Sequence, residues 1–111
     1  MKTFSIAICL AAALMFLSQN ANAQVDAKKA LDAANKAACT ACHQLDKKMV
    51  GPAYKDVAKK YKGNAGALAL LSDKVRKGGQ GVWGPIPMPP HTPSQISDAD
   101  LKLVTEWVLS L

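Results

Sequence analysis

Five consecutive residues, Cys39-Thr40-Ala41-Cys42-His43, place two thiols and an imidazole side by side in the chain. The pattern C-x-x-C-H is the attachment signature of a c-type haem. Its spacing follows from the chemistry, because two thiols must add across the two vinyl groups of one porphyrin. The histidine that follows then lies beneath the iron as an axial ligand. The motif therefore predicts one covalently bound haem c, held by Cys39 and Cys42 and ligated by His43.

Two other chemistries share the C-x-x-C spacing. A dithiol redox site usually accompanies a βαβ pattern, but no segment of this chain alternates convincingly as a strand. A zinc site needs a second pair of ligands, whereas His91 is the only other histidine and Cys9 the only other cysteine. Because Cys9 lies in an N-terminal apolar run that we expect to be removed, both alternatives are disfavoured.

An electron carrier needs both axial positions of its iron filled, so a second ligand is expected after the motif. The candidates are Met49, Met88 and His91. Met49 follows His43 by only six residues and cannot easily reach the opposite face. Met88 stands in Pro85-Ile86-Pro87-Met88-Pro89-Pro90, whose prolines restrict the backbone and so reduce the entropy lost on ligation. We expect His43 and Met88 to bind the iron; the alternatives are His91, an open site, and a Met88 that only fills a core gap.

The first 23 residues have the pattern of an export signal. Lys2 precedes an apolar run of about 14 residues, and Ala21-Asn22-Ala23 has the A-x-A form of a cleavage site. A membrane anchor is the alternative, but the run is shorter than the ~20 residues that span a bilayer. We therefore predict a removed signal peptide over residues 1–23, a single domain over residues 24–111, a periplasmic location and no stable membrane insertion.

Charge and composition narrow the class of partner. The chain has 111 residues and a net charge of +6, and the part after residue 23 keeps +5 because Lys2 is lost. In an exported protein this charge argues against nucleic-acid binding and favours an acidic partner surface or simple solubility. The predicted mature part is rich in alanine and short enough to have a thin core. A flat cofactor would supply apolar surface that the side chains lack.

Helical periodicity runs through most of this part. It predicts four helices, over residues 27–38, 52–62, 68–77 and 97–111. Pro52 is suited to the first position of the second helix, and Gly78-Gly79 ends the third. Ser97 and Asp100 form a capping-box pattern at the start of the fourth. Residues 80–96, which hold five of the six prolines, are expected to be irregular.

Two further segments join the haem motif in a resemblance. They are Lys48-Met49-Val50-Gly51-Pro52-Ala53-Tyr54-Lys55-Asp56-Val57 and Gln80-Gly81-Val82-Trp83-Gly84-Pro85-Ile86-Pro87-Met88-Pro89-Pro90. With the motif, they are similar to the bacterial cytochrome c-551 family of small class I c-type cytochromes. The resemblance implies an all-α class I cytochrome c fold with about four helices around the haem. It also implies a periplasmic carrier that passes single electrons to a nitrite reductase, a terminal oxidase or a peroxidase.

The resemblance carries over to individual residues. It implies that Cys39 and Cys42 bind the haem and that His43 and Met88 ligate the iron. It further implies that the Pro52 carbonyl accepts the other ring N–H of His43, a contact that ligand histidines need in order to fix their tautomer. Trp83 would donate its indole N–H to a haem propionate, with plain packing as the alternative.

Two positions depart from the family pattern. Relatives often carry an arginine near the buried propionate, where this chain has Lys74, with Arg76 two residues on. Lysine lacks the planar fork of arginine, so the identity of that contact is open. His91 stands where relatives often carry an amide that bonds the methionine sulfur. We expect His91 to be solvent-exposed; the alternative is that its charge tunes the iron.

Six lysines near the haem motif form a basic run: Lys47, Lys48, Lys55, Lys59, Lys60 and Lys62. They are either a solvated helix face or a patch that steers an acidic redox protein. Since no acid pair or nucleophile accompanies the haem, we expect an electron carrier rather than an enzyme, and a monomer. Gas binding, or peroxidase-like chemistry with His91 as the base, would require an iron that Met88 does not ligate.

Overall fold

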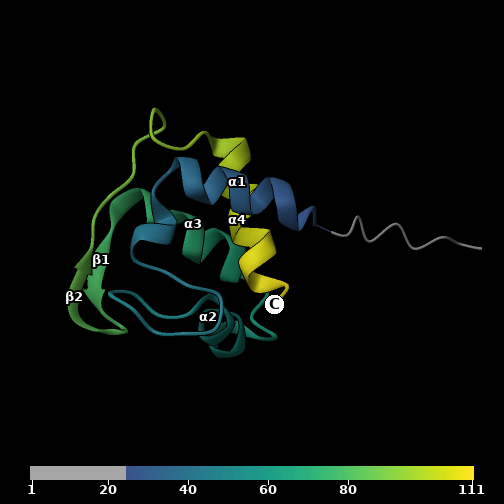
Figure 1. The fold of residues 1–111 in the computed structure, drawn as a ribbon. Coiled ribbons are helices and arrows are strands. Elements are labelled where there is room, and N and C mark those ends of the chain that lie inside the picture. Colours follow the sequence, from purple (N-terminus) through teal and green to yellow (C-terminus); the bar gives the residue numbers. More distant parts are fainter. Residues whose placement is uncertain (1–24) are drawn as a thin grey trace, which may run out of the picture.

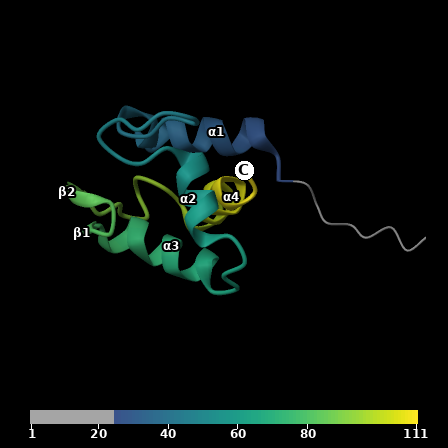
Figure 2. The same cartoon turned by 90° about the horizontal axis from the view of Figure 1, so that it is seen from below.

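The long C-terminal helix α4 (Asp98–Leu109) is the element against which the other helices pack. The structure is a computed structural model and describes residues 25–111, so the predicted signal peptide lies outside the described residues. Figure 2 shows α4 between α1 (Ala27–Lys36) and α3 (Ala67–Lys77), with α2 (Tyr54–Tyr61) beside it, and in the view of Figure 1 α4 crosses behind α1. Within residues 25–111, no helix combines the length and apolar character needed to cross a membrane. The predicted all-α architecture is confirmed.

The first helix ends before the haem motif. Asp26 caps α1 by accepting a hydrogen bond from the Lys29 N–H at 3.1 Å, and the helix stops at Lys36. Ala38 then has a left-handed backbone with a φ of 61°. A continuous helix through residue 38 was therefore a wrong prediction. The left-handed residue, which is costly for alanine, turns the chain so that Cys39 begins a separate 3₁₀ turn, η1 (Cys39–Ala41).

The second helix begins at Tyr54 and not at Pro52 as predicted. Ala53 is its N-cap and accepts the first helical hydrogen bond, from the Val57 N–H at 3.1 Å. The Pro52 carbonyl therefore stays outside the helical ladder. This shift of two residues matters because it leaves that carbonyl available to another donor.

The third helix ends as predicted, at Gly78. This residue has a φ of 70° and donates its N–H to the Lys74 carbonyl at 2.7 Å. The expectation of no strand was wrong, because β1 (Gly79–Gly81) and β2 (Gly84–Met88) form a short antiparallel hairpin. Alternating hydrophobicity could not reveal it, since both strands are largely exposed and rich in glycine and proline. The prolines of β2 lie between its paired positions, Gly84 and Met88, where a missing N–H costs least.

The core combines the small alanines of α1 with larger side chains of α2 and α4, such as Tyr54, Leu101 and Trp107. Ser97 caps α4 by accepting from the Asp100 N–H at 3.1 Å, as predicted. The buried face of α4 meets the alanines of α1, and no large side chain within residues 25–111 is completely buried. The predicted fourth helix ran to residue 111, but α4 stops at Leu109, and Leu111 lies beyond it and is 40 % exposed. The side chains alone leave a thin core, as the composition indicated.

Candidate haem site

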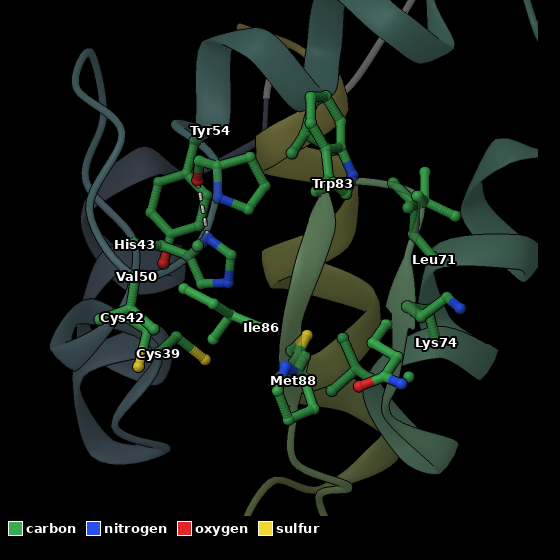
Figure 3. A pocket seen from close by; sticks show the side chains of 18 of the residues that line it. Cys39, Cys42, His43, Val50, Tyr54, Leu71, Lys74, Trp83, Ile86 and Met88 are labelled. Carbon is green, nitrogen blue, oxygen red and sulfur yellow. Dashed lines mark hydrogen bonds between the residues drawn. The ribbon is translucent and has the colours of Figure 1, made fainter.

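A cavity opens between the cysteine motif, α2, α3, the hairpin and α4 (Figure 3). Its lining contains all six residues that the sequence singled out for the cofactor: Cys39, Cys42, His43, Pro52, Trp83 and Met88. Most of the remaining wall is apolar and includes Val57, Leu71, Val75, Ile86, Val104 and Val108. A flat, largely apolar group with one metal atom fits these walls, because they offer burial together with sulfur and imidazole donors.

The 3₁₀ turn presents both cysteines to this cavity. The Cys42 and His43 N–H groups both donate to the Cys39 carbonyl, at 3.1 and 3.0 Å. Both thiols are free and half-buried. Burial, reinforced by the neighbouring Cys42 and partly offset by a backbone hydrogen bond, raises the pKa of the Cys39 thiol. The raised pKa disfavours the thiolate form of Cys39 that a metal would bind, whereas the position of both cysteines on one wall suits covalent attachment to one porphyrin.

The ring of His43 is held in one orientation. Its Nδ1 lies 2.7 Å from the Pro52 carbonyl oxygen. A carbonyl only accepts, so Nδ1 carries the proton and Nε2 keeps a lone pair for a metal. Gly51 permits this arrangement, because a Cβ placed there would lie 2.5 Å from the ring atom Cε1 of His43.

Tyr54 is a site residue that sequence reasoning missed. Its ring stacks on that of His43, with centroids 5.4 Å apart and planes 19° apart. It also meets the Trp107 ring in an edge-on arrangement, with centroids 5.4 Å apart and planes 66° apart. The hydroxyl is buried and has no hydrogen-bond partner among residues 25–111. Burial, with a smaller effect of Cys39, raises the pKa of Tyr54 well above its usual value. The helical periodicity of residues 54–61 gives Tyr54 an apolar position that faces the core, and no local pattern indicates the stacking.

Met88 lies on the hairpin side of the cavity and His43 on the cysteine side (Figure 3). Met88 is half-buried at the end of β2, where it pairs with Gly79. By contrast, Met49 is 40 % exposed and lies outside the cavity lining. The structure thus brings His43 and Met88, and not Met49, to one site.

Cationic and aromatic side chains surround the hairpin side of the cavity. Trp83 lines the cavity but is 40 % exposed, and the Lys60 ammonium lies 5.5 Å from the centroid of its ring. Lys74 also lines the cavity, and its Nζ occupies the space next to Gly79. Arg76 lies outside the lining and makes hydrogen bonds elsewhere. Of the two cations that the sequence left open, Lys74 is therefore the one beside the cofactor site.

The prediction that His91 is solvent-exposed was wrong. Its side chain is half-buried, and Nδ1 is shielded from solvent without a hydrogen-bond partner among residues 25–111. The backbone explains the burial, because the His91 N–H donates to the Val75 carbonyl of α3 at 2.9 Å and draws the residue against that helix. His91 is absent from the cavity lining, which removes the support for it as the iron ligand.

A structural zinc site also lacks support. Within residues 25–111, no three side chains among histidine, cysteine, aspartate and glutamate gather closely enough to hold a metal ion. The cysteine pair and His43 therefore have no further ligand of the kinds that zinc prefers.

Comparisons with known proteins agree with this geometry. The sequence model of the cytochrome c family, described as "Cytochrome c", matches residues 25–111. Cytochrome c-552 of Nitrosomonas europaea is 44 % identical over 111 residues, which cover 100 % of this chain and 99 % of that protein. Cytochrome c2 of Rubrivivax gelatinosus is 57 % identical over 76 residues, or 68 % of this chain and 89 % of that protein. The crystal structure of the Nitrosomonas europaea cytochrome c552 aligns with a TM-score of 0.67 and 48 % identity, and covers 73 % of this chain and 98 % of that one.

The fold and the site define a small class I c-type cytochrome. The chain belongs to the cytochrome c family, as its motifs predicted, and its cofactor is a covalently attached haem c with one iron. Like its relatives, it functions in electron transport.

Proposed function

We propose that this cytochrome is a periplasmic electron carrier whose iron is ligated by His43 and Met88. It exchanges single electrons with protein partners that present acidic docking surfaces, and it is not an enzyme. The observation that carries this proposal is the pair of donors on opposite walls of one cavity. The His43 ring is fixed by the 2.7 Å contact to the Pro52 carbonyl, and Met88 lies across from it.

Each residue of the site has a distinct task in this proposal. Cys39 and Cys42 hold the haem through thioether bonds, and the haem supplies an iron that gains or loses one electron. The Pro52 carbonyl keeps Nδ1 protonated, so that Nε2 is directed to the metal and made more basic. Met88 supplies a soft thioether, which raises the reduction potential relative to a second histidine.

The walls of the cavity suppress other chemistry. Apolar side chains such as Val57, Leu71 and Val104 line it and exclude water. With His43 and Met88 both bound to the metal, no site would be left there for a substrate. Because little solvent needs to reorganise when the charge changes, the site suits rapid electron exchange.

The edge of the cofactor is held at the hairpin. Trp83 lines the cavity and would donate its indole N–H to a haem propionate, and the ammonium of Lys74, which lines the same cavity, would supply the opposite charge. The Lys60 ammonium lies over the Trp83 ring. These contacts balance the charge of the cofactor where it would otherwise meet apolar walls.

The surface supports the choice of partner. All six lysines of the basic run are exposed, and Lys55 alone among them forms an ion pair within residues 25–111, with Asp46 at 2.6 Å. Unpaired exposed charges attract an oppositely charged protein and speed its approach. A terminal reductase, oxidase or peroxidase with an acidic surface fits these features. We expect no binding to nucleic acid and no stable membrane contact. We expect a monomer.

The spin state of the purified holoprotein tests the proposal. A His43/Met88 carrier is six-coordinate and low-spin, and its reduced form binds carbon monoxide slowly. A high-spin spectrum, or rapid binding of carbon monoxide, would show an open iron and would support gas binding or peroxidase-like chemistry in its place.

A further inference from the structure

The chain that follows Met88 is fastened to the end of α3. We call residues 88–96 the strap. At one end, the Met88 carbonyl packs against Gly78 so closely that a Cβ there would lie 2.5 Å from the oxygen. Three residues on, the His91 N–H donates to the Val75 carbonyl at 2.9 Å. The strap is thus positioned by backbone contacts to α3, and its residues 92–95 are exposed.

The partly buried Arg76 side chain ties the two ends of the strap together. Its side chain is only 20 % exposed, and its Nη1 donates to the Ile96 carbonyl at 2.8 Å and to the His91 carbonyl at 3.3 Å. Its Nη2 donates to the Asp98 carboxylate at 2.6 Å. One guanidinium therefore joins both ends of the exposed segment 92–95 and the first residue of α4. Hydrogen bonds from a charged donor are stronger than those between neutral groups.

The link from Arg76 to Met88 is short and stiff. Only Pro89 and Pro90 separate His91 from Met88. Prolines have a fixed φ, and consecutive prolines form an extended and semi-rigid backbone. Because the two prolines allow little backbone rotation, a displacement of the His91 backbone also moves Met88.

We propose that Arg76 is a positioning residue that keeps the Met88 sulfur at the iron, an inference that rests on the proposed ligation by Met88. With the strap closed, Met88 leaves the metal only when the hydrogen bonds of Arg76 also break. Arg76 thereby sets how readily an outside ligand displaces Met88. A direct role at the haem is a poorer fit, because Arg76 lies outside the cavity lining and its guanidinium is engaged with the strap.

The test is a titration of the ferric holoprotein with imidazole, which displaces Met88. The displacement is measured as the loss of the weak near-infrared band of the iron(III)–thioether bond. The variant is Arg76→Gln, and the matched control is Lys77→Gln. Lys77 lies in the same last turn, and its substitution removes the same charge, but Lys77 is 75 % exposed and, among residues 25–111, pairs only with Asp73 of its own helix. Asp98→Asn removes the ion pair alone, from a carboxylate that is 92 % exposed.

Arg76→Gln is expected to lower the imidazole concentration at half-displacement roughly tenfold, the equivalent of one lost hydrogen bond from a charged group. Lys77→Gln and Asp98→Asn are expected to stay within about twofold of the unmodified protein, because exposed ion pairs contribute little. Arg76→Lys, whose single ammonium can still reach a strap carbonyl, is expected to recover part of the effect. It also replaces Arg76→Gln as the test variant if the latter does not fold.

Two results would overturn the proposal, and they are distinguishable. If the unmodified protein has the band and Arg76→Gln lowers only its thermal midpoint while half-displacement is unchanged, Arg76 serves the fold and not the ligand. If the unmodified protein lacks the band, ligation by Met88 is itself wrong, and the role of Arg76 falls with it.

Discussion

Gly51→Ala is the substitution whose effect on the site can be worked out most directly. A Cβ at this position would lie 2.5, 2.8 and 3.0 Å from the Cε1, Nδ1 and Nε2 atoms of His43. Relaxed contacts between such atoms are ~3.5 Å or longer, so the ring or the loop must move by about 1 Å. Both neighbours are constrained, since the Gly51 N–H donates to the Cys42 carbonyl at 2.8 Å and His43 Nδ1 is bonded to Pro52.

The cost has two parts. Overpacking in a constrained interior costs ~1–3 kcal/mol, and weakening the Nδ1–H···O=C bond to Pro52 adds ~1 kcal/mol. We therefore expect Gly51→Ala to lower the free energy of unfolding of the holoprotein by about 2–4 kcal/mol. The midpoint potential is expected to shift as well, because the orientation and basicity of His43 change.

The assays are urea unfolding and spectroelectrochemistry of the holoprotein, with Gly66→Ala as the matched control. A Cβ at Gly66 meets only the Asn64 Oδ1 atom, at 3.4 Å, and its φ of −89° suits alanine. The control is expected to change the free energy of unfolding by no more than ~1 kcal/mol. If Gly51→Ala matches its control in both stability and potential, the close packing around His43 is not what holds the ring.

Three further predictions concern stability at alkaline pH, the salt dependence of reduction and the substitution of His91. Because the raised pKa of Tyr54 stabilises the folded state below the unfolded pKa of about 10, stability is lost as pH rises above that value. Tyr54→Phe should reduce this alkaline loss, measured by urea unfolding against pH, and an unchanged slope contradicts the burial of its hydroxyl. The rate of reduction by an acidic redox protein, measured by stopped flow, should fall roughly tenfold between low and physiological salt. The fall should be smaller in the double variant Lys59→Gln/Lys62→Gln, and a rate that does not depend on salt would rule out electrostatic steering. His91→Asn should shift the midpoint potential, because the Nδ1 atom of His91 is buried without a hydrogen-bond partner among residues 25–111 and the residue follows Met88 by three positions; an unchanged potential in spectroelectrochemistry would assign His91 a packing role only.

The residues that gather at the cavity could be predicted from local sequence, whereas the contacts that support them could not. A five-residue spacing singled out Cys39, Cys42 and His43, and the flanking prolines singled out Met88; all four line one cavity, and their roles at the haem stay predictions. The stacking of Tyr54 on His43 and the fit of Gly51 under the ring arise only when the loop between η1 and α2 closes. No periodicity encodes such contacts.

The errors in the fold have a similar origin. The hairpin of β1 and β2 is stabilised by pairing between exposed glycine- and proline-rich segments, so hydrophobic alternation could not indicate it. His91 was expected in solvent because of the usual surface habit of histidine. Its burial comes from the hydrogen bond to Val75 on a helix distant in sequence. The predicted helix ends held wherever a cap residue was present, at Ser97 and Gly78.

Ligation of the iron by both His43 and Met88 is the central claim, and the near-infrared band of the ferric holoprotein tests it most directly. The matched variants are Met88→Leu and Met49→Leu, which remove the only two methionines after residue 23. The band should be present in the unmodified protein and in Met49→Leu, and it should be absent from Met88→Leu. A band that persists in Met88→Leu, or that disappears in Met49→Leu, would contradict the account.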